Sequence, residues 1–389
     1  MPKPITPPEA EELQAAIDRG VDFLLADQRP DGRWGSAEKT KGLNIYSPVP
    51  GAHHAFRSAV TGLAVSALIE AEPTLDSQRA ARVAEAIDRG RDWMFEHSAG
   101  VRRANADALY NTWGHAFALH GFVRLYHRAA GDDDLRARIV EAAQQQADLL
   151  SRYSYLNGGW GYYDFTAHTQ VPGGSPNSFT TATGLIALHE ARELGVTYPE
   201  SKVEKGVESL LRQRFPDFSY AYGEYLMRMP RMGINRPAGS LGRSQACNLA
   251  LRYLEEEVTG ETLVTDDVLK TWLNRLYARN GWLSIGRKYP VPHEAPFGVA
   301  GYFYYYGHFY AALTLELLPD AERVYFQDHL AHLLLPLQEK DGSWWDYPFY
   351  NYHQQYGTAM AILSLRRCQH GPLVEDAVEQ VAEAESAVR

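Results

Sequence analysis

The feature that most constrains the fold of this chain is a pair of helical segments that recurs six times along its 389 residues. Each copy begins with an amphipathic segment, continues through a loop rich in Gly, Trp and Pro, and ends with a segment of small and aliphatic residues. A helix with one charged face belongs at the periphery, whereas a helix that is apolar all round must be covered on every side. Six helices of each kind therefore predict two concentric rings.

The periodicity also predicts where these helices lie. The charged outer helices are expected at 9–28, 77–97, 134–153, 200–214, 266–278 and 321–337. The inner helices are expected at 55–70, 108–127, 178–193, 243–254, 304–317 and 356–367. We therefore expect an all-α protein in which residues 1–370 form a single (α/α)6 toroid domain, with an apolar inner ring and a polar outer ring. A C-terminal helix within 371–389 is expected to pack on its outside. An open helical solenoid has the same period and is the alternative architecture.

A glutamine, a glycine and a tryptophan recur at the same spacing near both ends of the chain, in QRPDGRW at 28–34 and QEKDGSW at 338–344. A degenerate copy, SYLNGGW, occupies 154–160, and we interpret Gly281-Trp282 as a remnant of another. Glycine permits a tight turn after the outer helix, and tryptophan can pack over that turn. The glutamine amide can bond backbone groups that are left free at a helix end. The motif is therefore expected to fasten one repeat to the next.

These QxxxGxW motifs resemble those of the squalene cyclase and protein prenyltransferase β-subunit superfamily, and the resemblance covers nearly the whole chain. It implies an enzyme of the terpene-cyclase type that acts on an apolar, isoprenoid-like small molecule in a central cavity. The family's DxDD acid motif and DDxxD magnesium motif do not occur in this sequence. The nearest match to the prenyltransferase zinc ligands is Gln245 and Cys247 together with His353, in which a glutamine replaces the expected carboxylate.

Four histidines occupy two shared positions of the predicted inner helices. His115 and His308 fall at one position, and His54 and His353 fall at another about one turn earlier. If the ring closes, their four repeats are consecutive, so at least two of these histidines are expected to meet at the mouth. Three interpretations stay open: they bind a divalent metal, they help to hold an anionic head group, or they satisfy loop carbonyls and helix ends. No nucleotide cofactor is expected.

Several charged residues near the same mouth complete the candidate site. Arg57 and Arg243 occupy matching repeat positions and are candidates for substrate binding, as is His54. Asp107 is a candidate catalytic residue together with His115, His308 and His353. The other carboxyl groups expected near the mouth belong to Asp164, Glu224 and Asp346. Any of these carboxyls could serve as a general acid if burial raised its pKa.

Aromatic residues are abundant, at 12% of the sequence with 24 tyrosines, and the densest run lies between residues 302 and 310. Aromatic faces stabilise carbocations through their negative quadrupoles. The candidates for substrate binding in this class are Trp113, Tyr304, Tyr306 and Tyr310. Helical geometry turns only part of such a run toward a cavity, and the remainder is core packing.

Charge and hydropathy restrict the partners. With 38 Lys and Arg against 48 Asp and Glu, and no basic block between aromatics, nucleic acid is not expected as a partner. No segment has the unbroken apolar length that spans a bilayer, although an apolar patch resting on a membrane surface stays compatible with the sequence. The two separated cysteines and the absence of a signal-peptide pattern indicate a cytoplasmic protein.

Two other classes of function fit a helical toroid. One is a carbohydrate-active lyase or hydrolase, in which Trp and Tyr platforms hold a sugar beside a pair of carboxylates in an open groove. The other is a non-catalytic small-molecule-binding or scaffold protein, for which a cavity lined by apolar groups alone would be typical. The shape and lining of the central cavity should therefore separate the three classes.

Overall fold

The structure is a computed structural model that describes residues 1–42, 50–164 and 171–371. Within these ranges the secondary structure is helical, and extended backbone pairs only in isolated bridges. The all-α prediction is confirmed. The C-terminal helix predicted within 371–389 falls outside the described residues. No described helix is both long enough and apolar enough to cross a lipid bilayer.

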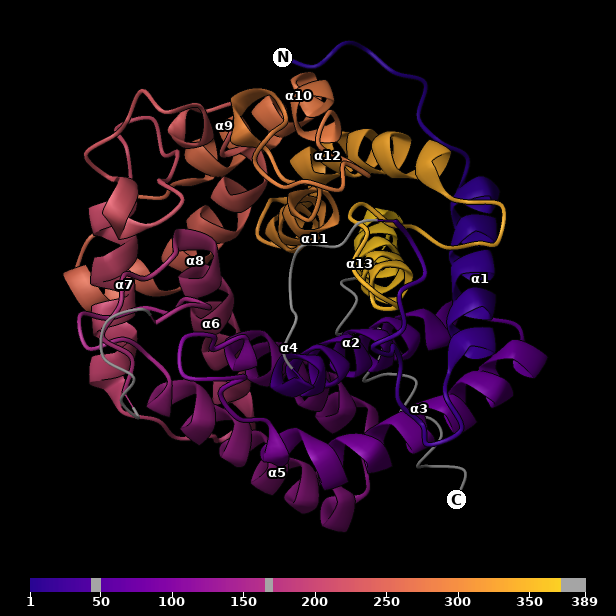
Figure 1. Ribbon diagram of the computed structural model, residues 1–389. Helices are drawn as coiled ribbons and strands as arrows, with labels where there is room; N and C mark the ends of the chain where they lie inside the picture. The colour runs from indigo at the N-terminus through magenta and orange to yellow at the C-terminus, as the bar shows by residue number, and fades with distance from the viewer. Residues whose placement is uncertain (43–49, 165–170, 372–389) are drawn as a thin grey trace.

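The helices form two concentric rings, which Figure 1 shows along the ring axis. The outer ring consists of α1 (Ala10–Asp27), α3 (Ser77–His97), α5 (Asp133–Arg152), α7 (Glu200–Gln213), α9 (Asp266–Ala278) and α12 (Asp320–Leu334). The inner ring consists of α2 (Pro50–Ala71), α4 (Asn111–Arg128), α6 (Ser178–Ala191), α8 (Leu241–Thr259), α11 (Phe303–Leu315) and α13 (His353–Cys368). A short helix, α10 (Asn280–Ser284), follows α9. The alternation predicted from the sequence is thus confirmed for all six pairs.

Burial explains why the two kinds of helix separate. In the outer helix α3 the buried residues are spaced by three or four positions, as in Val83, Ala86, Ile87 and Gly90, so a single face contacts the core. In the inner helix α11, by contrast, every residue is buried. A helix covered on all sides tolerates few charges, because a buried charge without a partner is costly.

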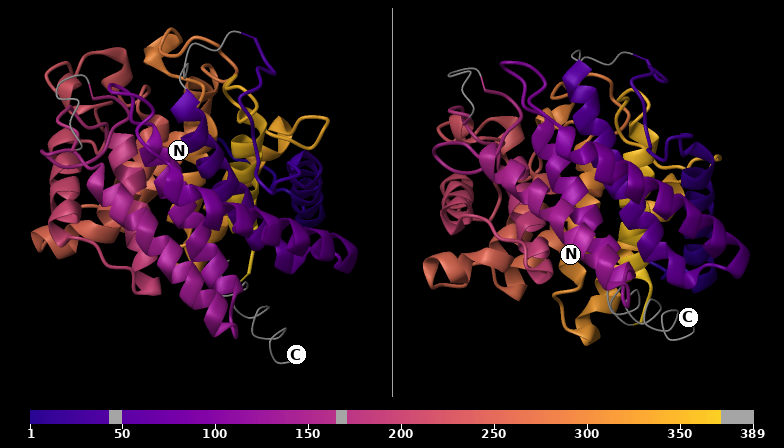
Figure 2. Two further views of the ribbon diagram at one scale, coloured as in Figure 1. Left: turned by 60° about the horizontal axis from the view of Figure 1, so that its bottom comes forward. Right: turned by 90° about the horizontal axis from the view of Figure 1, so that it is seen from below.

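The inner ring is closed, which rules out the open solenoid. Each inner helix packs against the next, and α13 packs against both α2 and α1 of the first repeat. The long loops that precede the inner helices lie along the upper edge in both side views of Figure 2. This edge is called the mouth below. The N-terminal ends of the inner helices face the mouth, and their C-terminal ends face the opposite, closed end.

The glutamine, glycine and tryptophan motifs form the junctions between repeats. The Gln28 amide donates hydrogen bonds to the carbonyl oxygens of Gly32 and of Ala86, both at 2.8 Å, and Ala86 belongs to the outer helix of the next repeat. The Gln338 amide bonds in the same way to Gly342 and Ala16, both at 2.9 Å. Since Ala16 lies on α1, the second motif joins the last repeat to the first, as the sequence predicted.

The motif glycines are required for two independent reasons. Gly32, Gly158 and Gly342 have φ angles of 94°, 95° and 87°, in the left-handed region that other residues rarely adopt. A Cβ atom on any of them would also collide with a backbone carbonyl of the next outer helix. The interpretation of Gly281-Trp282 as a motif remnant is wrong. Trp282 is 42% exposed on α10, and it stacks against Phe297 instead of filling a junction.

Ion pairs among buried side chains fill the closed end of the inner ring. Glu70 on α2 accepts hydrogen bonds from Arg124 Nε of α4 at 3.1 Å and from Arg367 Nη2 of α13 at 3.0 Å. Glu70, Arg124 and Arg367 are all at most 3% exposed. The Glu70 carboxylate therefore joins the first, second and last repeats through groups that have lost their contact with water.

The same network continues in both directions around the ring. Arg367 Nε lies 3.1 Å from Glu316, and Arg124 Nη2 lies 3.5 Å from Glu190 of α6, which also bonds His120 Nδ1 at 2.7 Å. Burial by itself would raise the pKa of Glu190, but its electrostatic interactions with His120 and Arg124 lower it to about 2. Glu190 is therefore ionised at neutral pH, and the network continues at the far end of the ring as carboxylates paired with buried guanidinium groups.

Replacing Glu70 with Ala should leave two buried guanidinium groups without their shared carboxylate. We expect the free energy of unfolding to fall by about 3–5 kcal/mol, the range for breaking one side of a buried ion pair. Denaturant unfolding followed by circular dichroism measures this change. The control is Glu96→Ala on an exposed face of α3, which should change the free energy of unfolding by less than about 0.5 kcal/mol. Equal stability of the two variants would show that the network does not hold the ring together.

Candidate active site

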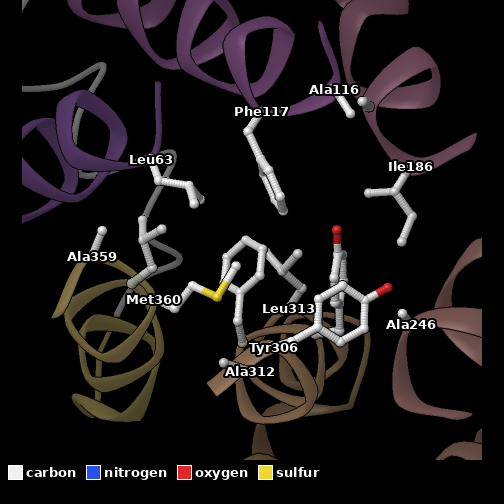
Figure 3. Packing of buried hydrophobic residues seen from close by; sticks show 14 of the residues in the cluster. Leu63, Ala116, Phe117, Ile186, Ala246, Tyr306, Ala312, Leu313, Ala359 and Met360 are labelled. Atoms are coloured by element: carbon white, nitrogen blue, oxygen red, sulfur yellow. The ribbon is translucent and has the colours of Figure 1, made fainter. Parts of the chain in front are cut away.

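A cavity of about 180 Å³ lies inside the inner ring, on the side of the mouth. Its wall is almost entirely apolar and strongly aromatic. It consists of Phe56, Ala59, Val60, Leu63, Tyr110, Trp113, Phe117, Tyr162, Phe179, Tyr302, Phe303, Tyr306, Tyr347, Phe349, Tyr356 and Met360. Figure 3 shows Leu63, Phe117, Tyr306 and Met360 directed toward the space between the inner helices.

The wall residues come from the N-terminal part of five inner helices and from the loops in front of them. The aromatic side chains of the wall contact one another in pairs. The Trp113 ring stacks on Phe117 and on Phe179, each with 6.0 Å between ring centroids, and the Phe179 ring meets Phe303 edge to face at 5.0 Å. Such a wall presents several π faces to a bound molecule, and π faces favour positive charge.

Asp346 is the carboxyl group that contacts this wall. It is fully buried, its Oδ1 accepts a hydrogen bond of 2.5 Å from the Tyr356 hydroxyl, and its Oδ2 accepts one of 3.0 Å from the backbone N–H of Tyr305. Burial raises the pKa of Asp346 to about 7, although these hydrogen bonds and Arg287 act in the opposite direction. Since Tyr356 lines the cavity, a carboxyl group that retains a proton near neutral pH lies one hydroxyl away from the cavity.

The other carboxyl candidates lie in different environments. Asp107 is exposed on the loop before α4, so the burial that the prediction required of a general acid is absent there. Asp164 is buried but has Arg103 Nη2 at 3.5 Å, and Glu224 is paired with Arg212 at 2.6 Å. A general acid was expected among the carboxyl groups whose pKa is raised by burial, and Asp346 meets this condition.

The four candidate histidines bond to partners in their own surroundings. His115 Nδ1 bonds Gln146 at 2.8 Å, His308 Nδ1 bonds the carbonyl of Tyr304 at 2.7 Å, and His54 Nε2 bonds the carbonyl of His97 at 3.1 Å. His353 Nδ1 bonds the carbonyl of Tyr350 at 2.5 Å. Burial lowers the pKa of His115, His308 and His353 to about 4.

The four histidines thus bond four separate partners, and these contacts do not gather them at one point of the mouth. Across the described ranges, no group of three or more His, Cys, Asp or Glu side chains could hold a metal ion. None of the four histidines lies in the cavity wall. The repeat register placed them correctly along their helices, but it could not fix the direction of each side chain. The interpretation that fits is the third one, in which they satisfy loop carbonyls and neighbouring polar groups.

The remaining candidates divide between the wall and the packing behind it. Trp113 and Tyr306 lie in the cavity wall and stay candidates for substrate binding. The Tyr304 hydroxyl bonds Asn280 at 2.9 Å and the Tyr310 hydroxyl bonds Thr183 at 3.1 Å, and neither residue lies in the wall.

Both candidate arginines also lie behind the wall. The guanidinium of Arg243 is buried and donates to the carbonyl oxygens of Tyr220, Gly239 and Ile234, so it fixes the loop before α8. Arg57 bonds to Tyr352 and is not a wall residue. These positions do not favour an anion site made by the two arginines.

Most of the wall was missed by reasoning from the sequence. Phe117, Phe179, Phe303, Tyr356 and Met360 occupy the first two turns of their inner helices. An aromatic residue near the start of an inner helix is the signal that would have identified four of them. Spacing alone did not distinguish these aromatics from ordinary core residues.

Solved structures with this architecture include enzymes of different classes. A variant of the type II terpene cyclase MstE from Scytonema, without ligand, has 16% sequence identity and a TM-score of 0.50, over 92% of this chain and 97% of its own. A cellobiose 2-epimerase from Spirochaeta thermophila has 15% identity and a TM-score of 0.54, over 92% of this chain and 96% of its own. An α-amylase from Clostridium perfringens has 13% identity and a TM-score of 0.52, over 91% of this chain and 97% of its own.

The chain has the α/α toroid fold. The fold implied by the sequence resemblance is thereby confirmed. No family model and no curated protein matches the sequence. Because the toroid is shared by a terpene cyclase and by carbohydrate enzymes, function has to be argued from the site.

Asp346→Asn should change how stability depends on pH. The pKa of Asp346 is about 7 when folded, against 3.8 for its ordinary value, so its favourable contribution is complete below about pH 4 and is lost as the pH rises through 7. We expect the wild type to lose up to about 4 kcal/mol relative to the variant between pH 4 and pH 8. Urea unfolding at several pH values measures this difference. Asp107→Asn is the exposed control, and a wild-type profile parallel to that of Asp346→Asn would contradict the assignment.

Proposed function

We propose that this protein is a terpene-cyclase-like enzyme that binds an apolar, isoprenoid-type molecule in the central cavity and starts its cyclisation with a proton. The observation that carries this proposal is the combination of an aromatic wall with one buried acid, Asp346, bonded to the wall residue Tyr356. An apolar wall excludes water and leaves few hydrogen-bonding groups for a sugar. A chain of hydrocarbon units gains free energy from the same surface.

The proton comes from the Asp346 and Tyr356 pair. When Asp346 is protonated, its O–H donates to the Tyr356 oxygen, and the Tyr356 O–H is free to turn toward the cavity. Transfer breaks the Tyr356 O–H bond and forms a bond to the substrate, while the proton of Asp346 restores the tyrosine. The net change is loss of one proton from Asp346 and gain of one positive charge on the substrate.

The strength of this acid indicates a class of substrate. A carboxyl group with a pKa of about 7 is a weak acid for a plain alkene, whereas an epoxide oxygen accepts a hydrogen bond before its C–O bond breaks. We therefore propose an isoprenoid with a terminal epoxide as the preferred substrate. The rings of Trp113, Phe117 and Phe179 would stabilise the cation that forms when the epoxide opens.

The two alternative classes lack comparable support. A sugar enzyme needs paired carboxylates beside an open binding groove. The cavity wall contains no carboxylate among the described residues. A non-catalytic carrier would share the apolar wall, but it has no use for a protonated carboxyl group behind a wall tyrosine.

Turnover is tested with farnesol, geranylgeraniol and their terminal epoxides, with products separated by gas chromatography and mass spectrometry. We expect cyclised products from an epoxide, and a loss of at least about 100-fold in rate for Asp346→Asn, the usual scale for removing a general acid. Asp107→Asn serves as the control and should keep the wild-type rate. Tight binding without conversion would indicate a carrier, and full activity of Asp346→Asn would place the acid elsewhere.

We further propose that the molecule takes up its substrate at a membrane surface. Six exposed large apolar residues, Tyr225, Met229, Met232, Trp282, Ile285 and Tyr289, lie in two mouth loops at 224–236 and 280–298 and are 42–58% exposed. The two loops are in contact: a Cβ atom added to Gly233 would lie 3.1 Å from the Cα atom of Phe297. The exposed Arg228, Arg231 and Arg236 in the first loop suit anionic lipid.

Membrane contact is tested by sedimentation with vesicles of phosphatidylcholine, with and without phosphatidylserine. We expect binding that depends on phosphatidylserine and falls at least about fivefold in the double variant Trp282→Ser and Ile285→Ser, because the apolar contact is lost. The matched control is Val324→Ser and Tyr325→Ser on the outer helix α12, where two exposed apolar residues lie away from the mouth loops. Equal binding of both double variants would contradict the assignment of this surface.

A further inference from the structure

Four side chains form a continuous hydrogen-bonded chain that starts in the cavity wall and ends at His293. Tyr162, a wall residue, bonds through its hydroxyl to Tyr222. The Tyr222 hydroxyl lies 3.4 Å from that of Tyr302, a second wall residue. The Tyr302 hydroxyl lies 3.1 Å from His293 Nε2. His293 is partly exposed, so the chain joins the cavity to the surface of the mouth.

The last member fixes the direction of the chain. His293 Nδ1 lies 2.8 Å from the carbonyl oxygen of Gly298, which can only accept a hydrogen bond, so Nδ1 carries the proton. In neutral imidazole the other nitrogen is then an acceptor, and Tyr302 must donate to Nε2. Because the Tyr302 hydroxyl donates its proton to His293, its oxygen can accept a hydrogen bond from the Tyr222 hydroxyl. The Tyr222 oxygen can in turn accept a hydrogen bond from the Tyr162 hydroxyl. Every O–H in the chain is thus free to point outward, toward His293.

The surroundings keep His293 neutral and hold it in place. Burial lowers the pKa of His293, and the positive charge of Arg243 on α8 acts in the same direction, although the bond to Gly298 opposes them. The ring also meets Tyr222 edge to face at 5.1 Å.

The backbone that carries His293 is strained. His293 has φ of 65°, and Lys288 and Phe297 in the same loop have φ of 65° and 62°. Non-glycine residues in this left-handed region store strain, which persists where the surrounding structure imposes it and is frequent at functional sites.

We propose that this chain is the route by which a proton leaves the cavity at the end of the reaction, with His293 as the terminal base. The inference rests on the proposed function, since it requires a carbocation in the cavity. A C–H bond next to the cationic carbon breaks, and its electron pair forms a C=C bond. When the proton passes to the Tyr302 oxygen, the Tyr302 proton moves to His293 Nε2. When it passes to the Tyr162 oxygen, the Tyr162 proton moves to Tyr222, the Tyr222 proton to Tyr302 and the Tyr302 proton to His293 Nε2. The imidazolium then releases a proton to water at its exposed edge.

The chain divides the two proton steps between different groups. Asp346 with Tyr356 supplies the proton, and Tyr302 with His293 removes one. The two sites are neighbours in the wall, since the Tyr302 ring meets that of Tyr347, the residue after Asp346, at 5.6 Å. Asp346, which has just lost its proton, is therefore not required to take one back from the carbocation. Because the chain removes a proton from the carbocation, the product is expected to be an alkene.

The first experiment tests the chain without any substrate. Nitrogen-15 NMR of histidine-labelled protein should show His293 as the Nδ1–H tautomer, with its signals assigned by their loss in His293→Asn. Asparagine is chosen because it tolerates a positive φ. Tyr302→Phe removes the donor to Nε2 and should shift that resonance by several ppm, whereas Tyr289→Phe, an exposed tyrosine of the same loop, should not. An unchanged Nε2 signal in Tyr302→Phe overturns the chain.

The second experiment tests the role of the chain with a substrate that the wild type converts. Without the terminal base, the cation survives until water captures it. We expect the ratio of alkene to alcohol products to fall at least tenfold in His293→Asn and in Tyr302→Phe, with melting temperatures close to that of the wild type. His332→Asn on an exposed face of α12 is the control. An unchanged product ratio in both variants overturns the role of His293, whereas failure of the wild type to convert any probe defeats the proposed function itself.

Discussion

The contact that recurs at both ends of the chain is the glutamine amide that bridges its own turn and the outer helix of the next repeat. At the seam it acts together with the packing of α13 on α1 and α2 and with the ion pairs of Glu70. Gln28 makes this contact between the first and second repeats, and Gln338 makes it between the last repeat and the first. In a solenoid such a junction would only extend the stack. Here α13 packs against α2, and the Gln338 amide joins the last repeat to the first as the Gln28 amide joins the first to the second.

Closure in turn explains why the cavity lies where it does. The six inner helices cannot all meet at the ring axis, so space remains along it. The side chains that border this space differ between its two ends. At the closed end, the Glu70 carboxylate pairs with the guanidinium groups of Arg124 and Arg367. At the mouth, large aromatic side chains line the space without filling it. The ion network is costly to build in the interior, so its net contribution to stability is smaller than the loss expected when one partner is removed.

The buried polar groups of the inner ring are of two kinds: some bond only loops and neighbouring helices, and others bond a residue of the cavity wall. Arg243 is buried and donates to backbone carbonyls, and each of the four candidate histidines bonds a backbone carbonyl or a neighbouring amide through one ring nitrogen. Asp346 differs because burial raises its pKa and its partner, Tyr356, is part of the cavity wall. His293 differs because its partner Tyr302 is also in the wall. Asp346 and His293 thus each reach the cavity through the hydroxyl of a wall tyrosine.

The sequence by itself determined the helices, their assignment to two rings and the junction motifs, because burial on one face or on all faces is written in the spacing of apolar residues. It also named Asp346 among the carboxyls whose role would depend on burial, and Trp113 and Tyr306 among the aromatics. Only the tertiary structure decided which of these carboxyls is buried and which aromatics face the cavity. The register of a helix fixes a position to within a residue, whereas 100° of rotation separates successive side chains. The rotation of each helix about its own axis leaves His115 and His308 outside the wall and places Phe117 and Tyr356 in it. That rotation is determined by the packing of neighbouring helices, which no local sequence pattern encodes.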